Sequence, residues 1–164
     1  MSKTIDDPLR ALAARLGAAA RARGAMIATA ESCTGGLVAG AITAIAGSSA
    51  WFERGFVAYS NMAKEQQLGV APSTIERFGA VSEETAKAMA EGAVRGAPAQ
   101  WAVAVTGIAG PDGGSPDKPV GTVWFAWAGP EHLQTLRRQF DGDRTAVREA
   151  SVRVALEGLV DRLA

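Results

Sequence analysis

The sequence predicts an α/β domain whose helices are layered against a mixed β-sheet. Segments with apolar residues at helical spacing alternate along the chain with short apolar segments that are typical of strands. Toward the C-terminus, two strand-like segments follow one another without a helix between them, which favours a mixed sheet over a purely parallel one. The length of 164 residues fits a single domain, residues 1–164, with a substantial core.

The expected helices are recognised by their start and stop signals. The first begins at Asp6-Asp7-Pro8, since acids and an early proline favour a helix N-terminus, and it ends at Gly24. Segment 35–46 is rich in small residues and apolar nearly all round, so we expect a buried helix there. Ser82 can cap a helix that extends to residue 95. The remaining helices are expected at 61–68, at 74–78 and from about 143, the last with an apolar stripe of Val147, Ala150, Val154, Leu159 and Leu163.

The expected strands are short apolar or alternating segments, and they lie at residues 26–30, 52–60, 101–106, 120–127 and 133–140. The last two are joined by a turn at Gly129-Pro130. Glycine and proline cluster only between residues 107 and 119. We interpret that segment as one long loop and not as a boundary between domains.

Composition excludes several classes of function. The 17 basic and 17 acidic side chains balance, and there is no basic stretch, which argues against nucleic acid or an anionic membrane as the main partner. The chain has one cysteine, Cys33, and one histidine, His132. A single cysteine excludes an internal disulfide and a cysteine-cluster metal site, and a single histidine excludes a two-histidine metal face. We therefore expect no metal.

From the sequence we expect neither a targeting segment nor a membrane-spanning segment. Residues 1–7 contain no apolar run, so we expect no secretory signal. The longest apolar stretch, residues 37–46, is interrupted by Gly40 and Thr43 and is far shorter than the ~20 residues that span a bilayer. We expect a cytoplasmic protein in a reducing compartment.

The first candidate site is the segment at residues 30–36, with the sequence AESCTGG, where a strand ends and a helix begins. A helix N-terminus presents free backbone N–H groups that suit an anion or a developing oxyanion, and Ser32 there is well placed to be a nucleophile. The alternative is that Ser32 or Thr34 simply caps the helix. Cys33 is more typical of a small buried side chain than of a nucleophile paired with His132.

The second candidate site is the segment at residues 59–64, with the sequence YSNMAK, at another transition from strand to helix. If Lys64 is partly buried it loses its proton more easily, and a neutral lysine can serve as general base to a serine. The alternative is an ordinary solvated lysine on a helix.

Two further segments could bind a ligand. The glycine-rich segment 106–114, TGIAGPDGG, follows a buried strand, where α/β proteins usually place ligand loops, although it matches no nucleotide fingerprint. Arg144 and Arg148 share one face of the last helix and could grip a phosphate. The alternatives are a flexible connection for the loop, and solvated arginines behind a helix cap at Asp143.

These segments together make the chain resemble the CinA C-terminal domain family (competence/damage-inducible protein CinA), including its single-domain nicotinamide-nucleotide amidohydrolases, or NMN deamidases. The resemblance covers about residues 9–163, and its motifs are AESCTGG at 30–36, AGSSAWFERG at 46–55, YSNMAK at 59–64, GAVSE at 79–83, TGIAGPDGG at 106–114, KPVGTVW at 118–124 and FDGDRTAVR at 140–148. It implies a three-layer α/β/α sandwich with a mixed, mostly parallel sheet, commonly a homodimer.

The resemblance also implies an activity and a site. The activity is metal-independent hydrolysis of the carboxamide of nicotinamide mononucleotide, without a cofactor, in pyridine nucleotide recycling. Ser32 matches the nucleophile, Lys64 the base and Tyr59 a supporting hydroxyl. The substrate contacts it implies are Thr34, Gly35, Gly36, Ser48, Asn61, Thr106, Gly107, Ile108, Ala109, Gly110 and Arg144. The alternative function is a non-catalytic nucleotide-binding or regulatory module linked to competence, because a fold does not determine a function.

Overall fold

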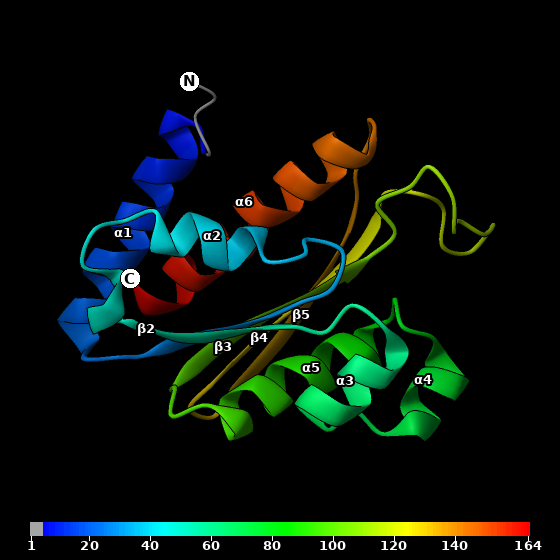
Figure 1. Cartoon of the computed structure of the whole chain (residues 1–164), viewed down its shortest axis with the longest axis horizontal. Helices are drawn as coiled ribbons and strands as arrows, with labels where there is room; N and C mark the ends of the chain where they lie inside the picture. The colour runs from blue at the N-terminus through cyan, green and yellow to red at the C-terminus, as the bar shows by residue number, and fades with distance from the viewer. Residues whose placement is uncertain (1–4) are drawn as a thin grey trace.

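The structure, a computed structural model, describes residues 5–164 (Figure 1). Its helices are α1 (Asp7–Arg23), α2 (Leu37–Thr43), α3 (Asn61–Leu68), α4 (Pro72–Phe78), α5 (Glu83–Gly96) and α6 (Arg144–Leu163), with a short 3-10 helix, η1 (Ser48–Ala50). Its strands are β1 (Ile27–Glu31), β2 (Phe52–Val57), β3 (Trp101–Gly107), β4 (Thr122–Gly129) and β5 (His132–Gln139).

The five strands form one sheet in the order β2-β1-β3-β4-β5. Strand β1 runs parallel to both of its neighbours, whereas β4 runs antiparallel to β3 and β5. All strands except β4 therefore point the same way. This arrangement confirms the predicted mixed, mostly parallel sheet, and the β4–β5 hairpin is the strand pair that lacks an intervening helix.

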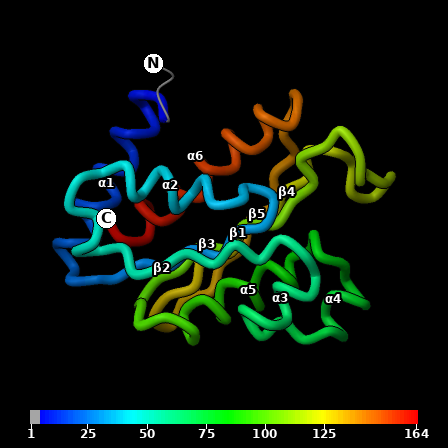
Figure 2. Tube along the Cα trace, in the orientation of Figure 1, coloured from blue at the N-terminus to red at the C-terminus, as the bar shows by residue number. Residues whose placement is uncertain are grey.

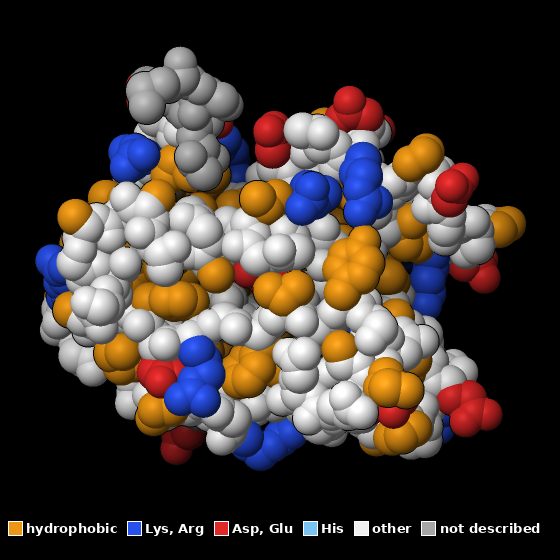
Figure 3. All heavy atoms as spheres, in the orientation of Figure 1, with side chains coloured by type: hydrophobic (Ala, Val, Ile, Leu, Met, Phe, Trp, Pro, Cys, Tyr) orange, Lys and Arg blue, Asp and Glu red, His pale blue; other side chains and the backbone are white. Residues whose placement is uncertain are grey.

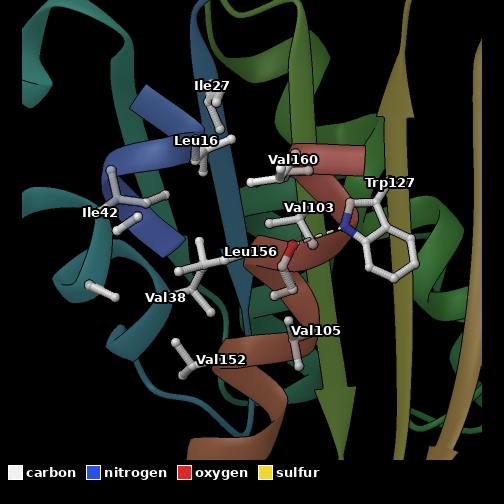
Figure 4. Close-up of a cluster of buried hydrophobic side chains, with 14 of the residues drawn as sticks. Leu16, Ile27, Val38, Ile42, Val103, Val105, Trp127, Val152, Leu156 and Val160 are labelled. Atoms are coloured by element: carbon white, nitrogen blue, oxygen red, sulfur yellow. Dashed lines mark hydrogen bonds between the residues drawn. The ribbon is translucent and has the colours of Figure 1, made fainter. Parts of the chain in front are cut away.

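Helices cover both faces of the sheet, which confirms the three-layer architecture. Figure 1 shows α1, α2 and α6 on one face and α3, α4 and α5 on the other. Successive side chains of a strand point to opposite faces of the sheet, and here the side chains on the two faces differ in size. The face toward α6 carries large side chains such as Val103, Val105 and Trp127, shown with Leu156 in Figure 4, where the Trp127 indole donates a hydrogen bond to the carbonyl of Ala155 (3.1 Å).

The face toward α5 carries small side chains instead. The alanines that alternate with the large residues on β1, β3 and β4 point to this side, and they are Ala28, Ala30, Ala102, Ala104, Ala126 and Ala128. Because an alanine fills little space, α5 lies close to the sheet and packs Met89 and Ala90 against it. The alternation of small and large residues thus determines how near each helical layer sits.

Element boundaries differ from the predictions where local geometry intervenes. The predicted helix at 35–46 begins only at Leu37, because Gly35 and Gly36 adopt positive φ angles of 57° and 104°. The predicted strand at 52–60 ends at Val57, and Ser60 instead caps α3 by accepting a hydrogen bond from the Ala63 N–H. The caps predicted at Ser82 and Asp143 are confirmed.

The architecture brings together the three segments that follow the parallel strands β1, β2 and β3. Strands β1, β2 and β3 are parallel, so their C-terminal ends lie at the same edge of the sheet, as the trace in Figure 2 shows. The segments that follow them are the turn at 32–36, the entry to α3 and the loop from Gly107 to β4. This edge is where α/β sheets usually bind ligands.

Within residues 5–164, no helix combines the length and apolar character needed to cross a membrane. The expectation that the chain lacks a secretory signal rests on residues 1–7, of which residues 1–4 lie outside the described part of the structure.

A pair of glycine substitutions tests the packing between α3 and α5. A Cβ atom at Gly92 of α5 would overlap the backbone carbonyl of Leu68, whereas one at Gly40 of α2 would meet nothing within 4 Å. We expect Gly92→Ala to lower the free energy of unfolding by about 1–3 kcal/mol. The matched change Gly40→Ala should raise it by up to about 1 kcal/mol, because alanine favours a helix. Urea unfolding measures both, and equal effects of the two changes would contradict this packing.

Candidate active site

The structure brings Ser32 and Lys64 together, although they are 32 residues apart in the sequence. Ser32 directly follows β1, and Lys64 lies in the first turns of α3, which follows the neighbouring strand β2. The Lys64 Nζ lies 3.0 Å from the Ser32 Oγ. Ser32 is 8% exposed and Lys64 only 1%. This distance and burial are those expected for a nucleophile and its base.

The amine of Lys64 has only uncharged partners. Its Nζ donates to the backbone carbonyls of Ala58 (3.2 Å) and Tyr59 (3.1 Å), and no ion pair formed by the described residues includes it. Burial lowers the pKa of Lys64 below its ordinary value of 10.5. In the neutral form, the two carbonyls take the two N–H bonds of the amine, so the nitrogen lone pair is directed at the Ser32 hydroxyl.

A cavity of about 280 Å³ opens beside this pair. Of the predicted site residues, it is lined by Ser32, Tyr59, Asn61, Lys64, Thr106, Gly107, Ile108, Ala109, Gly110 and Arg144. These residues come from four separate parts of the chain, which meet only at the C-terminal edge of the parallel strands. A larger cavity of about 670 Å³ lies between α1, α2 and α6 and contains neither Ser32 nor Lys64.

Tyr59 and Arg144 lie at the mouth of the cavity. The Tyr59 carbonyl contacts Lys64, whereas its hydroxyl accepts a hydrogen bond from Nη2 of Arg144 (3.0 Å), and the side chain is 58% exposed. Nη1 of Arg144 donates to the carbonyl of Gly110 (2.9 Å). The structure therefore connects Tyr59 to Lys64 through the Tyr59 backbone, and Arg144 joins α6 to the glycine-rich loop.

Four predicted contact residues do not line the cavity. Thr34, Gly35 and Gly36 form the turn behind Ser32, and the Thr34 hydroxyl donates to the carboxylate of Glu31 (2.6 Å). Ser48 lies in η1, which precedes β2 and is therefore at the opposite edge of the sheet. Ser48 precedes β2, whereas Ser32 and Lys64 follow the strands next to them in the chain. Local sequence does not reveal at which edge of the sheet a turn between a helix and a strand lies.

The N-terminus of α2 is not open to a ligand, contrary to the expectation of a free anion site there. The carboxylate of Glu31 accepts hydrogen bonds from the N–H groups of Val38 (2.8 Å) and Ala39 (3.1 Å). The residue at the cap position is Gly36, so the alternative that Ser32 or Thr34 caps this helix is wrong. No role was predicted for Glu31 from the sequence, although an acidic residue at the end of an apolar strand indicates a special environment.

Further residues line the cavity. Asp112 and Gly113 belong to the candidate loop 106–114, and Cys33 belongs to the candidate segment 30–36. Ala80 and Val81 were missed, and the hydroxyl of Thr106 donates to the Ala80 carbonyl (2.7 Å). Both belong to the GAVSE motif at 79–83, but their residue types do not indicate a contact.

Cys33 is a buried structural side chain. It is 5% exposed, and burial raises the pKa of its thiol to about 11. The thiol therefore stays protonated at neutral pH, where it is a poor nucleophile. His132 lies at the start of β5, beside the ring of Trp101, at the opposite edge of the sheet. The Cys33–His132 pair that the sequence analysis disfavoured is absent.

Among residues 5–164, no group of three or more histidine, cysteine, aspartate or glutamate side chains is arranged to hold a metal ion.

Comparison with known proteins identifies the family. Residues 9–163 match the CinA C-terminal domain. The chain belongs to the CinA C-terminal domain family, which confirms the resemblance drawn from its motifs.

Two curated relatives and one solved structure are similar along almost their whole length. The nicotinamide-nucleotide amidohydrolases PncC of Pseudomonas putida and Escherichia coli K12 are each 56% identical to the chain, over 94% of it and over 96% and 94% of their own lengths. The crystal structure of the competence/damage inducible protein CihA from Agrobacterium tumefaciens superposes with a TM-score of 0.94, at 50% identity and 98% coverage of both chains.

The pKa of Lys64 makes stability depend on pH. Between the lowered pKa of the folded state and the ordinary value of 10.5, the unfolded chain binds more protons than the folded one, so stability contributed at this site rises with pH. Below the folded pKa, the cost of burying the ammonium is present in full. We expect the free energy of unfolding of the wild type to rise relative to Lys64→Met as pH increases from neutral to about 10.

The matched control is Lys87→Met, which removes an exposed lysine that pairs with Glu83. Urea unfolding across the pH range measures both differences. A difference between wild type and Lys64→Met that stays constant with pH would contradict the lowered pKa.

Proposed function

We propose that this protein hydrolyses the carboxamide of nicotinamide mononucleotide to nicotinic acid mononucleotide and ammonia. The observation that carries the proposal is the buried contact of 3.0 Å between Lys64 Nζ and Ser32 Oγ at the edge of a cavity. The names of relatives that are 56% identical over most of the chain support an amide as the bond cleaved.

In the first half of the proposed reaction, neutral Lys64 takes the proton of the Ser32 hydroxyl as Oγ attacks the amide carbon. The C–N bond of the tetrahedral intermediate then breaks, and the Lys64 ammonium gives its proton to the departing nitrogen, which leaves as ammonia. The product on the enzyme is an ester between Ser32 and the nicotinoyl group. The carbonyls of Ala58 and Tyr59 keep the amine directed at Oγ throughout.

In the second half, water replaces ammonia. Lys64 takes a proton from the water as its oxygen attacks the ester, and Ser32 Oγ leaves with that proton. This is the logic of a serine–histidine pair with lysine in place of imidazole. Negative charge on the substrate oxygen would be stabilised by the backbone N–H of Cys33, the one residue of the turn at 33–36 that lines the cavity.

The geometry also supports an orientation for the nucleotide. A cavity of about 280 Å³ is near the lower limit of usual ligand sites, so the pyridine ring would be enclosed and the rest of the nucleotide would extend outward. Arg144 lies at the mouth, where its guanidinium could exchange the Tyr59 hydroxyl and the Gly110 carbonyl for a phosphate.

Activity measurements test the mechanism. We expect Ser32→Ala and Lys64→Met to reduce kcat/KM for ammonia release from nicotinamide mononucleotide by at least about 10³-fold, because each removes a group that reacts. In the wild type, kcat/KM should rise with pH through a pKa below 10.5, since the free amine is the active form. Cys33→Ser should retain most of the activity, and EDTA should leave it unchanged.

Full activity in Ser32→Ala or Lys64→Met would contradict the Ser–Lys mechanism. Calorimetric binding of the nucleotide by the wild type without any ammonia release would instead support the alternative of a non-catalytic binding module.

We further propose that the protein acts in the cytoplasm, in pyridine nucleotide recycling, as a homodimer. Large apolar side chains are exposed beside the edge strand β2, and Figure 3 shows hydrophobic side chains on this face between the two helical layers. They are Leu37, Val57, Tyr59 and Met62. Such exposed groups are typical of a surface that binds another protein.

Light scattering tests the dimer. The expected mass is twice the 16.9 kDa of one chain, and Val57→Lys with Met62→Lys should shift the protein toward the monomer because two like-charged side chains would face the partner. A monomeric wild type at all concentrations would contradict the homodimer.

A further inference from the structure

Glu31 is a buried carboxylate that accepts hydrogen bonds from a hydroxyl and two backbone N–H groups. It ends β1 and is 1% exposed. One of its oxygens accepts hydrogen bonds from the Thr34 hydroxyl (2.6 Å) and the Val38 N–H (2.8 Å), and the other accepts from the Ala39 N–H (3.1 Å). None of the ion pairs in the described part of the chain includes it. A buried carboxylate is costly unless such bonds compensate for lost water, so this position has a demanding geometry.

Glu31 and Ser32 point to opposite faces of the sheet. Ala28 and Ala30 of β1 face α5, whereas Ile27 faces the layer of α1, α2 and α6. Strand alternation puts Glu31 on the same side as Ile27, where it binds α2, and directs Ser32 to the other side, where Lys64 lies. Because the two residues are adjacent, the orientation of the Glu31 side chain determines which way Ser32 faces.

The backbone of the turn is held at other points as well. The Ser32 N–H donates to the Val105 carbonyl of β3 (2.9 Å). The guanidinium of Arg148, from α6, donates to the carbonyls of Cys33 (3.1 Å) and Thr34 (3.4 Å). The Leu37 N–H of α2 donates to the Thr34 carbonyl of the turn (3.0 Å). Glu31 adds the next two N–H groups of α2, those of Val38 and Ala39, and ties them to the end of β1.

We propose that Glu31 is a positioning residue for the amide hydrolysis, whose carboxylate clamps the turn at 32–36 to α2 so that Ser32 Oγ faces Lys64 Nζ. The inference rests on the proposed function of Ser32 and Lys64. Glu31 does not line the cavity and so acts through Ser32 and not on the substrate. Its carboxylate also fills the N-terminus of α2, which leaves Arg144 as the cationic group for the substrate phosphate.

The test is Glu31→Gln, which keeps the shape of the side chain. An amide offers one acceptor oxygen and places a donor NH₂ against groups that are themselves donors, so at least one of the three hydrogen bonds is lost. We expect kcat to fall by about 10²-fold, because a nucleophile displaced by about 1 Å loses that much. KM should change by less than about threefold, since the cavity lining is intact. Thr34→Val removes a single bond and should cause a smaller fall.

A second readout reports on the turn itself. Cys33 is the single cysteine of the chain, and it is buried within the turn. Cys33 lines the cavity but is only 5% exposed, so alkylation of its thiol by iodoacetamide is slow unless the turn opens further. We expect the alkylation rate to rise about tenfold or more in Glu31→Gln, with a smaller rise in Thr34→Val.

Two control variants separate this role from general destabilisation. Glu91→Gln removes an exposed carboxylate on α5, and Met89→Ala weakens the apolar core on the other face of the sheet. Both should keep the wild-type kcat and alkylation rate, even though Met89→Ala lowers the melting temperature by as much as Glu31→Gln or more.

Wild-type kcat and alkylation rate in Glu31→Gln would overturn the inference, as would the same losses in Met89→Ala. The proposed function fails separately, if the wild type releases no ammonia from nicotinamide mononucleotide. In that case the alkylation rates still decide whether Glu31 holds the turn: a faster rate in Glu31→Gln alone supports the clamp, and an unchanged rate overturns it.

Discussion

The buried amine of Lys64 is the group on which the rest of the site depends. A lysine that is 1% exposed and contacts only a hydroxyl and two carbonyls has no negative charge to stabilise its ammonium form. Burial lowers the pKa of Lys64 because the ammonium form loses its hydration, and the same two carbonyls direct the lone pair of the neutral amine at Ser32. Burial of a lysine usually only lowers the free energy of unfolding. Here it also favours the neutral amine, which makes Lys64 a candidate base.

That environment exists because of how the sheet is packed. The alanines of β1, β3 and β4 allow the layer of α3, α4 and α5 to lie close to the sheet, and Lys64 is enclosed within this layer. On the other face, larger side chains support α2 and α6. There Glu31, at the end of β1, accepts hydrogen bonds from α2, and Arg148 of α6 donates to the turn that carries Ser32. The turn that carries Ser32 is thus held from the layer of α2 and α6, whereas the Ser32 hydroxyl contacts Lys64 in the layer of α3.

Features governed by neighbouring residues could be predicted well. Ser82 and Asp143 cap their helices as expected, because a cap involves atoms only three residues apart. Helix α2 begins two residues later than predicted, because Gly35 and Gly36 adopt positive φ angles that are incompatible with a right-handed helix. Ser48 was expected among the substrate contacts and lies at the other edge of the sheet, since membership of a motif does not reveal which end of a strand a residue precedes.

The sequence by itself determined the class of fold, the positions of the elements and the residues Ser32 and Lys64 as candidates, since hydrophobic periodicity, caps and motif spacing are local properties. It left open whether the Lys64 side chain is solvated or buried. Only the tertiary structure decided this, because the burial of an amine and its pKa depend on groups that approach it from β1, β2 and α3 at once. The role of Glu31 was hidden for the same reason: its three donors become neighbours only when the chain turns back at Gly35 and Gly36.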